Sequence, residues 1–157
     1  MVDPDSAFSA GLLHDVGKII LVCFLDEEYK IFCEARANNN STQDFDLEQE
    51  VLGFNHADIG SFLTEQWKIP HKLTEAIQQH HHVETPDADS ALSCIVYMAN
   101  FLAKKTFYEM DEKYKVGSPD QQVMEFLGIQ EDDFDELQDL LRVEYAHSET
   151  FMQLVGM

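Results

Sequence analysis

The sequence predicts a compact all-α fold, and three observations lead to this prediction. Apolar residues recur at helical spacing in several stretches, such as Phe134, Leu137 and Leu141 near the C-terminus. No segment alternates apolar and polar residues cleanly enough to predict a strand. The 157 residues include seven Gly and four Pro and contain no low-complexity linker. We therefore expect a single domain over residues 1–157, with enough apolar residues, 45% of the chain, to form a core.

Turn and capping residues divide the chain into the expected helices. Ile20, Phe24 and Ile31 fall close to one helical face and favour a long helix before the polar run 38–43. Pro70 suits a first helical turn. The predicted helices in this half span residues 5–15, 18–37, 45–54, 56–67 and 70–82.

The second half shows similar signals. Pro86 and Asp87 suit the entry to an apolar helix over 88–106. Ser118, Pro119 and Gln121 resemble a capping box at the start of a helix over 120–127. A last helix is expected over 131–154. The core of the domain is therefore expected at about 5–106, followed by an acidic helical tail at about 118–157.

Charge excludes several classes of partner. Thirty Asp and Glu against ten Lys and Arg give a net charge of −20. Nucleic acids and anionic membranes bind through Lys and Arg, so we expect neither as a partner. Residues 120–157 hold ten acids and one base, Arg142, which predicts a solvated helix face or a docking surface for a basic partner.

The N-terminus and the cysteines indicate a compartment. Acids rather than bases stand at the N-terminus, where Asp3 and Asp5 flank a proline, and no apolar run has the length of a membrane span. Cys23, Cys33 and Cys94 are widely spaced in apolar stretches, which predicts buried, reduced thiols. We therefore expect a cytoplasmic protein.

Clustered histidines indicate a metal site. His14 stands beside Asp15, His56 lies near a glycine, and His80 and His81 are adjacent. Imidazole and carboxylate groups are common ligands of divalent transition metals. All-α proteins build such sites in the interior, from side chains on facing helices.

Three motifs in order resemble the HD phosphohydrolase superfamily. Residues 14–18 (His-Asp-Val-Gly-Lys) match H-D-x-G-K, residues 56–60 match H-x-x-x-G, and residues 76–81 match A-I-x-x-H-H. The flanking segments 50–53 and 67–70 are most similar to the HDOD subgroup, the HD-related output domains of bacterial signalling proteins. The resemblance covers roughly residues 5–106.

This resemblance implies an all-α, HD-domain-like bundle around a divalent metal, which would be Fe, Mn, Zn, Ni, Co or Mg. In catalytic relatives a metal-bound hydroxide attacks a phosphoester. Asp15 would bridge two metals, and Lys18 would meet a substrate phosphate, so these two residues carry the catalytic prediction. The implied metal ligands are His14, Asp15, His56, His80 and His81.

Departures from the catalytic pattern predict one ion, held by His56, His80, His81 and Asp15, rather than two, and they leave open an empty site with hydrogen-bonded histidines. Asn100 stands where catalytic members have an Asp, and an amide is a poor metal ligand. The chain begins too late to contain the upstream ligand of those members. It also lacks their G-Y-P pattern. If the chain is truncated, the missing helices would leave apolar surface exposed, and a homodimer would cover it.

Three functions stay open at this point. The first is a signalling module of HDOD type with a degenerate metal site, little or no catalysis, and protein partners. The second is a metal-dependent phosphohydrolase acting on a phosphorylated small molecule, such as a nucleotide or phosphodiester. The third is a helical interaction domain whose histidines are structural and whose acidic tail binds a basic partner.

Overall fold

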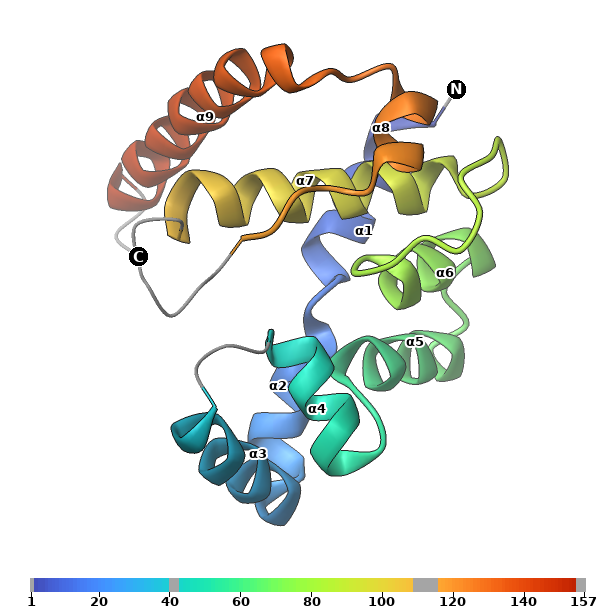
Figure 1. Cartoon of the computed structure of the whole chain (residues 1–157), viewed down its shortest axis with the longest axis vertical. Helices are drawn as coiled ribbons and strands as arrows, with labels where there is room; N and C mark the ends of the chain where they lie inside the picture. The colour runs from blue at the N-terminus through green and yellow to red at the C-terminus, as the bar shows by residue number, and fades with distance from the viewer. Residues whose placement is uncertain (1, 40–42, 109–115, 155–157) are drawn as a thin grey trace.

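The structure of the chain is a computed structural model that describes residues 2–39, 43–108 and 116–154 (Figure 1). Within these ranges every regular element is helical, which confirms the all-α prediction. The elements are α1 (Pro4–Leu13), α2 (Val16–Phe24), α3 (Asp26–Asn38), α4 (Asp44–Leu52), α5 (His56–Gln66), α6 (His71–Gln79), α7 (Ala91–Tyr108), α8 (Gln121–Leu127), the short 3-10 helix η1 (Glu131–Asp133) and α9 (Phe134–Leu154).

The helices form two groups that meet in the middle of the molecule. Helices α2, α3, α4 and α5 lie together at one end, while α7, α8 and α9 lie at the other (Figure 1). Helix α6 packs on both α5 and α7, and α1 packs on α6 and α7. The turn between α1 and α2 therefore lies where the two groups meet.

The single helix predicted over 18–37 is wrong, because the chain forms two helices there. Leu25 has φ −122° and ψ 58°, which is outside the helical region and ends α2. Three acids occupy the first turn of α3, where the helix dipole favours negative charge. Phe24 is consequently 74% exposed, and the continuous apolar face expected along this stretch does not form.

Local side-chain bonds shift other predicted helix starts by a few residues. Helix α7 begins at Ala91, because the Asp87 carboxylate accepts hydrogen bonds from the Asp89 and Ser90 backbone N–H groups at 2.9 Å. Helix α8 is capped by Asp120 rather than by Ser118, since the Asp120 carboxylate accepts from the Gln122 N–H at 2.7 Å. These corrections leave the order of the elements unchanged.

The interior differs between the two groups of helices. A C-terminal apolar core joins α7, α8 and α9, and it consists of Val83, Cys94, Met98, Phe101, Val123 and Phe134. A smaller apolar cluster joins α1, α6 and α7. The interior formed by α4, α5 and α6 is rich in polar side chains, namely Glu48, Asn55, His56, Ser61, Thr64, Thr74 and His80.

The cysteines were predicted to be buried, and this is correct for only one of them. Cys94 is buried in the C-terminal apolar core. Cys23 and Cys33 are exposed, because the helices that carry them lie at the outer end of the molecule.

No apolar run of the length of a membrane span was expected, but one stretch in the described part of the chain is long and apolar enough to qualify. Residues Pro4–Phe24 have the length and the hydropathy of a membrane-spanning helix, with a mean hydropathy of 1.6. Helices of soluble proteins and signal sequences meet the same criterion. Here the turn at His14 and Asp15 divides the stretch into α1 and α2 and points polar groups inward.

Candidate metal centre

A backbone contact between α2 and α5 positions the site. Gly17 lies against the backbone of His56, so that a Cβ atom on Gly17 would overlap the His56 carbonyl group. This close approach brings the turn with His14 and Asp15 beside the first residue of α5. The end of α6 supplies His80 to the same point. Glycine in the H-D-x-G-K motif is therefore required by packing.

Four side chains converge in what we call the His–Asp cluster, defined as Asp15, His56, His80 and His81. One ligand atom from each lies within 4.8 Å of all the others. Asp15 Oδ1 is 3.4 Å from His56 Nε2 and 3.5 Å from His80 Nε2. His56 Nε2 is 2.9 Å from His81 Nε2 and 3.3 Å from His80 Nε2.

Hydrogen bonds at the opposite ring atoms set the tautomers of two of these histidines. His56 Nδ1 donates to Glu48 Oε2 at 2.6 Å, and His80 Nδ1 donates to the Ile77 carbonyl oxygen at 2.6 Å. A carboxylate or carbonyl oxygen can only accept, so the proton resides on Nδ1. Each Nε2 then presents a lone pair to the centre of the cluster, as metal ligation requires.

The electrostatics favour neutral imidazoles around a charged carboxylate. Burial lowers the pKa of His80, and burial is also the largest cause that lowers the pKa of His81 far below its usual value. Burial of Asp15 acts in the opposite direction, but the neighbouring His80 and Lys18 outweigh it and hold the pKa of Asp15 well below its ordinary value. Neutral His and ionised Asp are the protonation states that bind metal.

The cluster fits one divalent transition metal. Asp15 Oδ1 is buried and has no hydrogen-bond partner among the described residues, which is costly for a carboxylate oxygen. Ligands about 2.0–2.2 Å from a metal lie roughly 3.0–3.5 Å from each other in tetrahedral or octahedral arrangements. The separations among these four residues, between 2.9 and 3.5 Å where measured, match that spacing.

Two further predicted site residues lie next to the cluster. His14 Nε2 is 3.4 Å from Asp15 Oδ2, and the His14 ring meets the His80 ring edge to face, but His14 is outside the group of four. Lys18 Nζ donates to the same Asp15 Oδ2 at 2.7 Å. The structure thus brings four of the five predicted ligands together and pairs Lys18 with Asp15.

Asn100, which replaces the expected aspartate, does not join the cluster. Its side-chain Nδ2 donates to the backbone carbonyl oxygen of His80 at 3.5 Å. The amide therefore supports the end of α6 and offers no charge to a second metal.

Sequence reasoning missed Glu48 and Phe45, both on α4. Glu48 is buried, and its carboxylate accepts from both the ring and the backbone N–H of His56, the latter at 2.7 Å. Phe45 stacks on the His81 ring with centroids 4.5 Å apart. A signal was present, since Glu48 stands between Phe45 and Leu52 at helical spacing, on an apolar face where an acid needs a partner.

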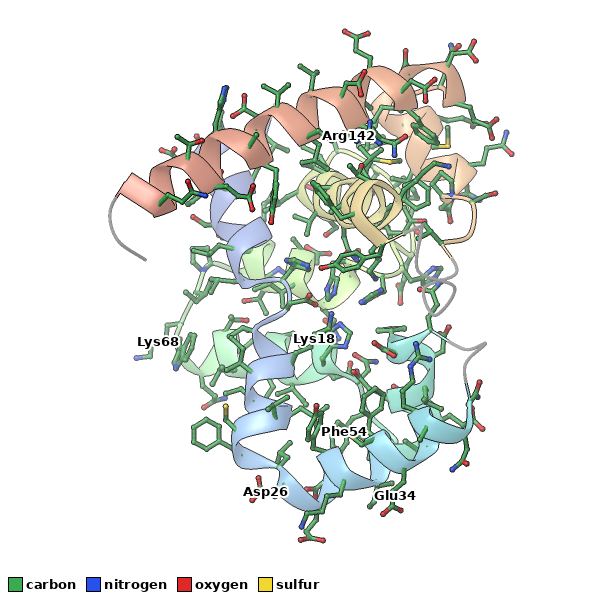
Figure 2. The ribbon with its side chains drawn as sticks, turned by 90° about the vertical axis from the view of Figure 1, so that its left-hand side faces the viewer. Lys18, Asp26, Glu34, Phe54, Lys68 and Arg142 are labelled. Carbon is green, nitrogen blue, oxygen red and sulfur yellow. The ribbon has the colours of Figure 1, made fainter. Side chains whose placement is uncertain are left out.

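A cavity of about 500 Å³ opens beside the cluster. Lys18, which lines it, lies in the middle of the molecule, between Arg142 on α9 at one end and Glu34 on α3 at the other (Figure 2). Its walls include three cations, Lys18, Arg36 and Lys104. A metal at the cluster would therefore face a space large enough for a small molecule.

Comparisons with known proteins agree with this architecture. An uncharacterized protein of Treponema pallidum (strain Nichols) is 28% identical over 108 residues, which cover 66% of this chain and 21% of the relative. The crystal structure of a "Putative signal transduction protein" from Marinobacter aquaeolei VT8 superposes with a TM-score of 0.74 at 21% identity, covering 96% of this chain and 32% of that one. The chain thus spans about a fifth and a third of these two relatives.

The family assignment comes from the N-terminal half of the chain. The HDOD domain model matches residues 1–83, which include every member of the His–Asp cluster and also Glu48. The resemblance deduced from the three motifs is confirmed, and this chain belongs to the HDOD domain family.

Proposed function

We propose that the chain is a signalling module whose His–Asp cluster holds one divalent metal ion and performs little or no catalysis. The observation that carries the proposal is that the two carboxylate oxygens of Asp15 have different neighbours. Its Oδ1 faces the histidines, whereas its Oδ2 accepts a hydrogen bond from Lys18. A carboxylate engaged by a lysine on one oxygen is poorly placed to bridge two metals. The family and the named role of the Marinobacter relative support a signalling role.

The donor set suggests which metals the cluster would prefer. Three imidazoles and one carboxylate suit Fe, Mn, Zn, Ni or Co better than Mg, which favours oxygen ligands. Glu48 would orient His56, and the Ile77 carbonyl would orient His80. When bound, such an ion acts as a Lewis acid and lowers the pKa of a water ligand.

The test is metal content. We expect about one ion per chain by elemental analysis of protein purified without chelator or immobilised-metal resin. The ion should be lost in the double variant His14→Ala/Asp15→Ala and retained in His71→Ala, which removes an exposed histidine 85% accessible to solvent. Two ions per chain, or none, would contradict the proposal. Circular dichroism of each variant checks that it is folded.

A metal-dependent phosphohydrolase is the second candidate, favoured by the cavity that places Lys18 beside the cluster. Lys18 would bind a phosphate of the substrate while Asp15 keeps it oriented. Phosphomonoesters, phosphodiesters and nucleotides should be assayed with Mn, Fe, Co and Ni. Robust turnover that disappears in Asp15→Asn would establish this candidate and reject the first one.

The expected partners follow from charge. With a net charge of −20, we propose protein partners in the cytoplasm rather than nucleic acid or anionic membrane. A second copy of the chain is a further candidate, because Phe8, Leu12 and Ile19 on α1 and α2 are largely exposed. Sedimentation of the purified chain would decide this point.

A further inference from the structure

The cavity beside the His–Asp cluster gathers positive charge in a strongly acidic protein. Lys18, Arg36 and Lys104 are three of the ten Lys and Arg residues in the chain. They come from α2, α3 and α7, so both groups of helices contribute to the cavity wall. Two carboxylates, Asp15 and Asp44, line the same space. A divalent ion at the cluster would make the cavity more positive still, and such a cavity attracts anions.

The three cations differ in how they are paired. Lys18 Nζ is 2.7 Å from Asp15, and Arg36 Nε is 3.0 Å from Asp44. Lys104 forms no hydrogen bond or ion pair with any residue of the described ranges, although its side chain is half-buried. Burial, and to a smaller degree the charge of Lys18, lowers the pKa of Lys104, whereas the carboxylates of Asp15, Asp44 and Glu48 act in the opposite direction. A bound anion would give the Lys104 ammonium group the partner that it lacks among the described residues.

We infer that the cavity binds a diphosphate group, with one phosphate at Lys18 beside the cluster and the other at Lys104. Lys18 comes from α2 and Lys104 from α7, so a ligand with two anionic groups can meet one cation from each group of helices. Orthophosphate offers a single anionic group to the two cations. The inference rests on the proposed metal centre for part of the affinity, since an ion at the cluster would add attraction for the phosphate at Lys18, whereas the contact of Lys104 is independent.

The two lysines at consecutive positions on α7 provide a matched control. Lys104 lines the cavity, whereas Lys105 Nζ lies over the rings of Phe101 and Phe134, 6.0 and 5.7 Å from their centroids. Lys104→Met and Lys105→Met therefore remove the same charge at neighbouring sites. Lys104→Arg keeps a cation at the cavity wall. Circular dichroism and metal content establish that each variant is folded and loaded.

The experiment is calorimetric titration of metal-loaded protein, dialysed free of excess metal, with inorganic pyrophosphate and with orthophosphate. Lys104→Met should weaken pyrophosphate binding about tenfold or more, the typical value of one charge-assisted hydrogen bond. Orthophosphate affinity should change far less, and Lys105→Met should match the unaltered protein. Lys104→Arg should restore most of the pyrophosphate affinity. Equal losses in the two lysine-to-methionine variants, or no loss in Lys104→Met, would overturn the inference.

Two further arms separate this inference from the proposed metal centre. In metal-free protein, pyrophosphate binding should be weaker yet still depend on Lys104. If the unaltered chain bound no metal but kept this dependence, the metal centre would fail and the diphosphate site would stand. ADP tests the source of the diphosphate group. If ADP binds more tightly than pyrophosphate, the diphosphate belongs to a nucleotide; if it binds more weakly, the ligand is a free diphosphate. Either result supports the site only if the binding depends on Lys104.

Discussion

The two groups of helices are held together by different forces. Around the His–Asp cluster the interior is polar, and directed hydrogen bonds such as that from His56 to Glu48 fix its geometry. In the C-terminal apolar core, apolar side chains such as Met98, Phe101 and Val123 pack against one another. Directed bonds give a site its geometry, whereas buried apolar area mainly gives stability. Mutations in the two regions should therefore separate metal binding from stability.

The largest expected effect is at Gly17, where the two backbones of the site meet. In Gly17→Ala the new methyl group would overlap the His56 carbonyl, and rigid backbone cannot move aside cheaply. We expect a loss of more than about 4 kcal/mol in the free energy of unfolding, together with loss of metal binding. Chemical denaturation and elemental analysis measure both.

Gly11 provides the control for this substitution. Nothing lies within 4 Å of a Cβ placed on Gly11, which is also helical. Gly11→Ala should stabilise the protein by about 0.5–1 kcal/mol through helix propensity. If the two variants behaved alike, the backbone contact would not be what positions the site.

The next effect is at Phe134, in the C-terminal apolar core. Its ring packs against Phe101 with centroids 5.8 Å apart, and Phe134→Ala would leave a cavity there. We expect the free energy of unfolding to fall by about 3 kcal/mol, with metal affinity unchanged at a temperature where the variant is folded. If Phe134→Ala also lowered metal affinity, the C-terminal apolar core and the His–Asp cluster would be energetically coupled.

Glu48→Gln should show the converse behaviour. The amide keeps the size of the side chain but removes the charge that orients His56 and makes it a stronger ligand. Metal affinity should fall by about 10–100-fold, as is usual when a group bonded to a metal ligand is altered. Glu50→Gln, at an exposed position two residues away, is the control. Titration calorimetry with Co²⁺ or Zn²⁺ compares them, and equal affinities would remove Glu48 from the site.

The smallest expected effect is the response of metal-free protein to acid. His80 and His81 have lowered pKa values when folded, so between pH 7 and 5.5 the unfolded chain binds more protons than the folded one. Stability must then decrease as the pH falls through this range, by about 1–2 kcal/mol. Denaturation at several pH values measures the decrease, and His81→Gln should reduce it. A flat profile would mean that these rings are not buried in neutral form.

Helical periodicity in the sequence predicted the fold class. The three motifs predicted that Asp15, His56, His80 and His81 lie close together. His56 and His80 come from helices separated in sequence, and only the family resemblance joined them in advance. The break at Leu25 was missed because a helical periodicity continued through it. Glu48 was missed because it is one of four acids at alternate positions, Asp44, Asp46, Glu48 and Glu50, and only the packing of α4 shows which one is buried. Such choices depend on tertiary contacts that local patterns do not contain.

The two hydrogen bonds that the Glu48 carboxylate accepts connect metal binding at His56 to the dynamics of α5 and α2. One carboxylate holds both the His56 ring and the first backbone N–H of α5, so ligand geometry and the start of that helix are locked together. The α5 backbone in turn supports α2 at Gly17. An ion bound at His56 would thus stiffen two helices without displacing them, and it would be sensed as slower hydrogen exchange rather than as a new shape.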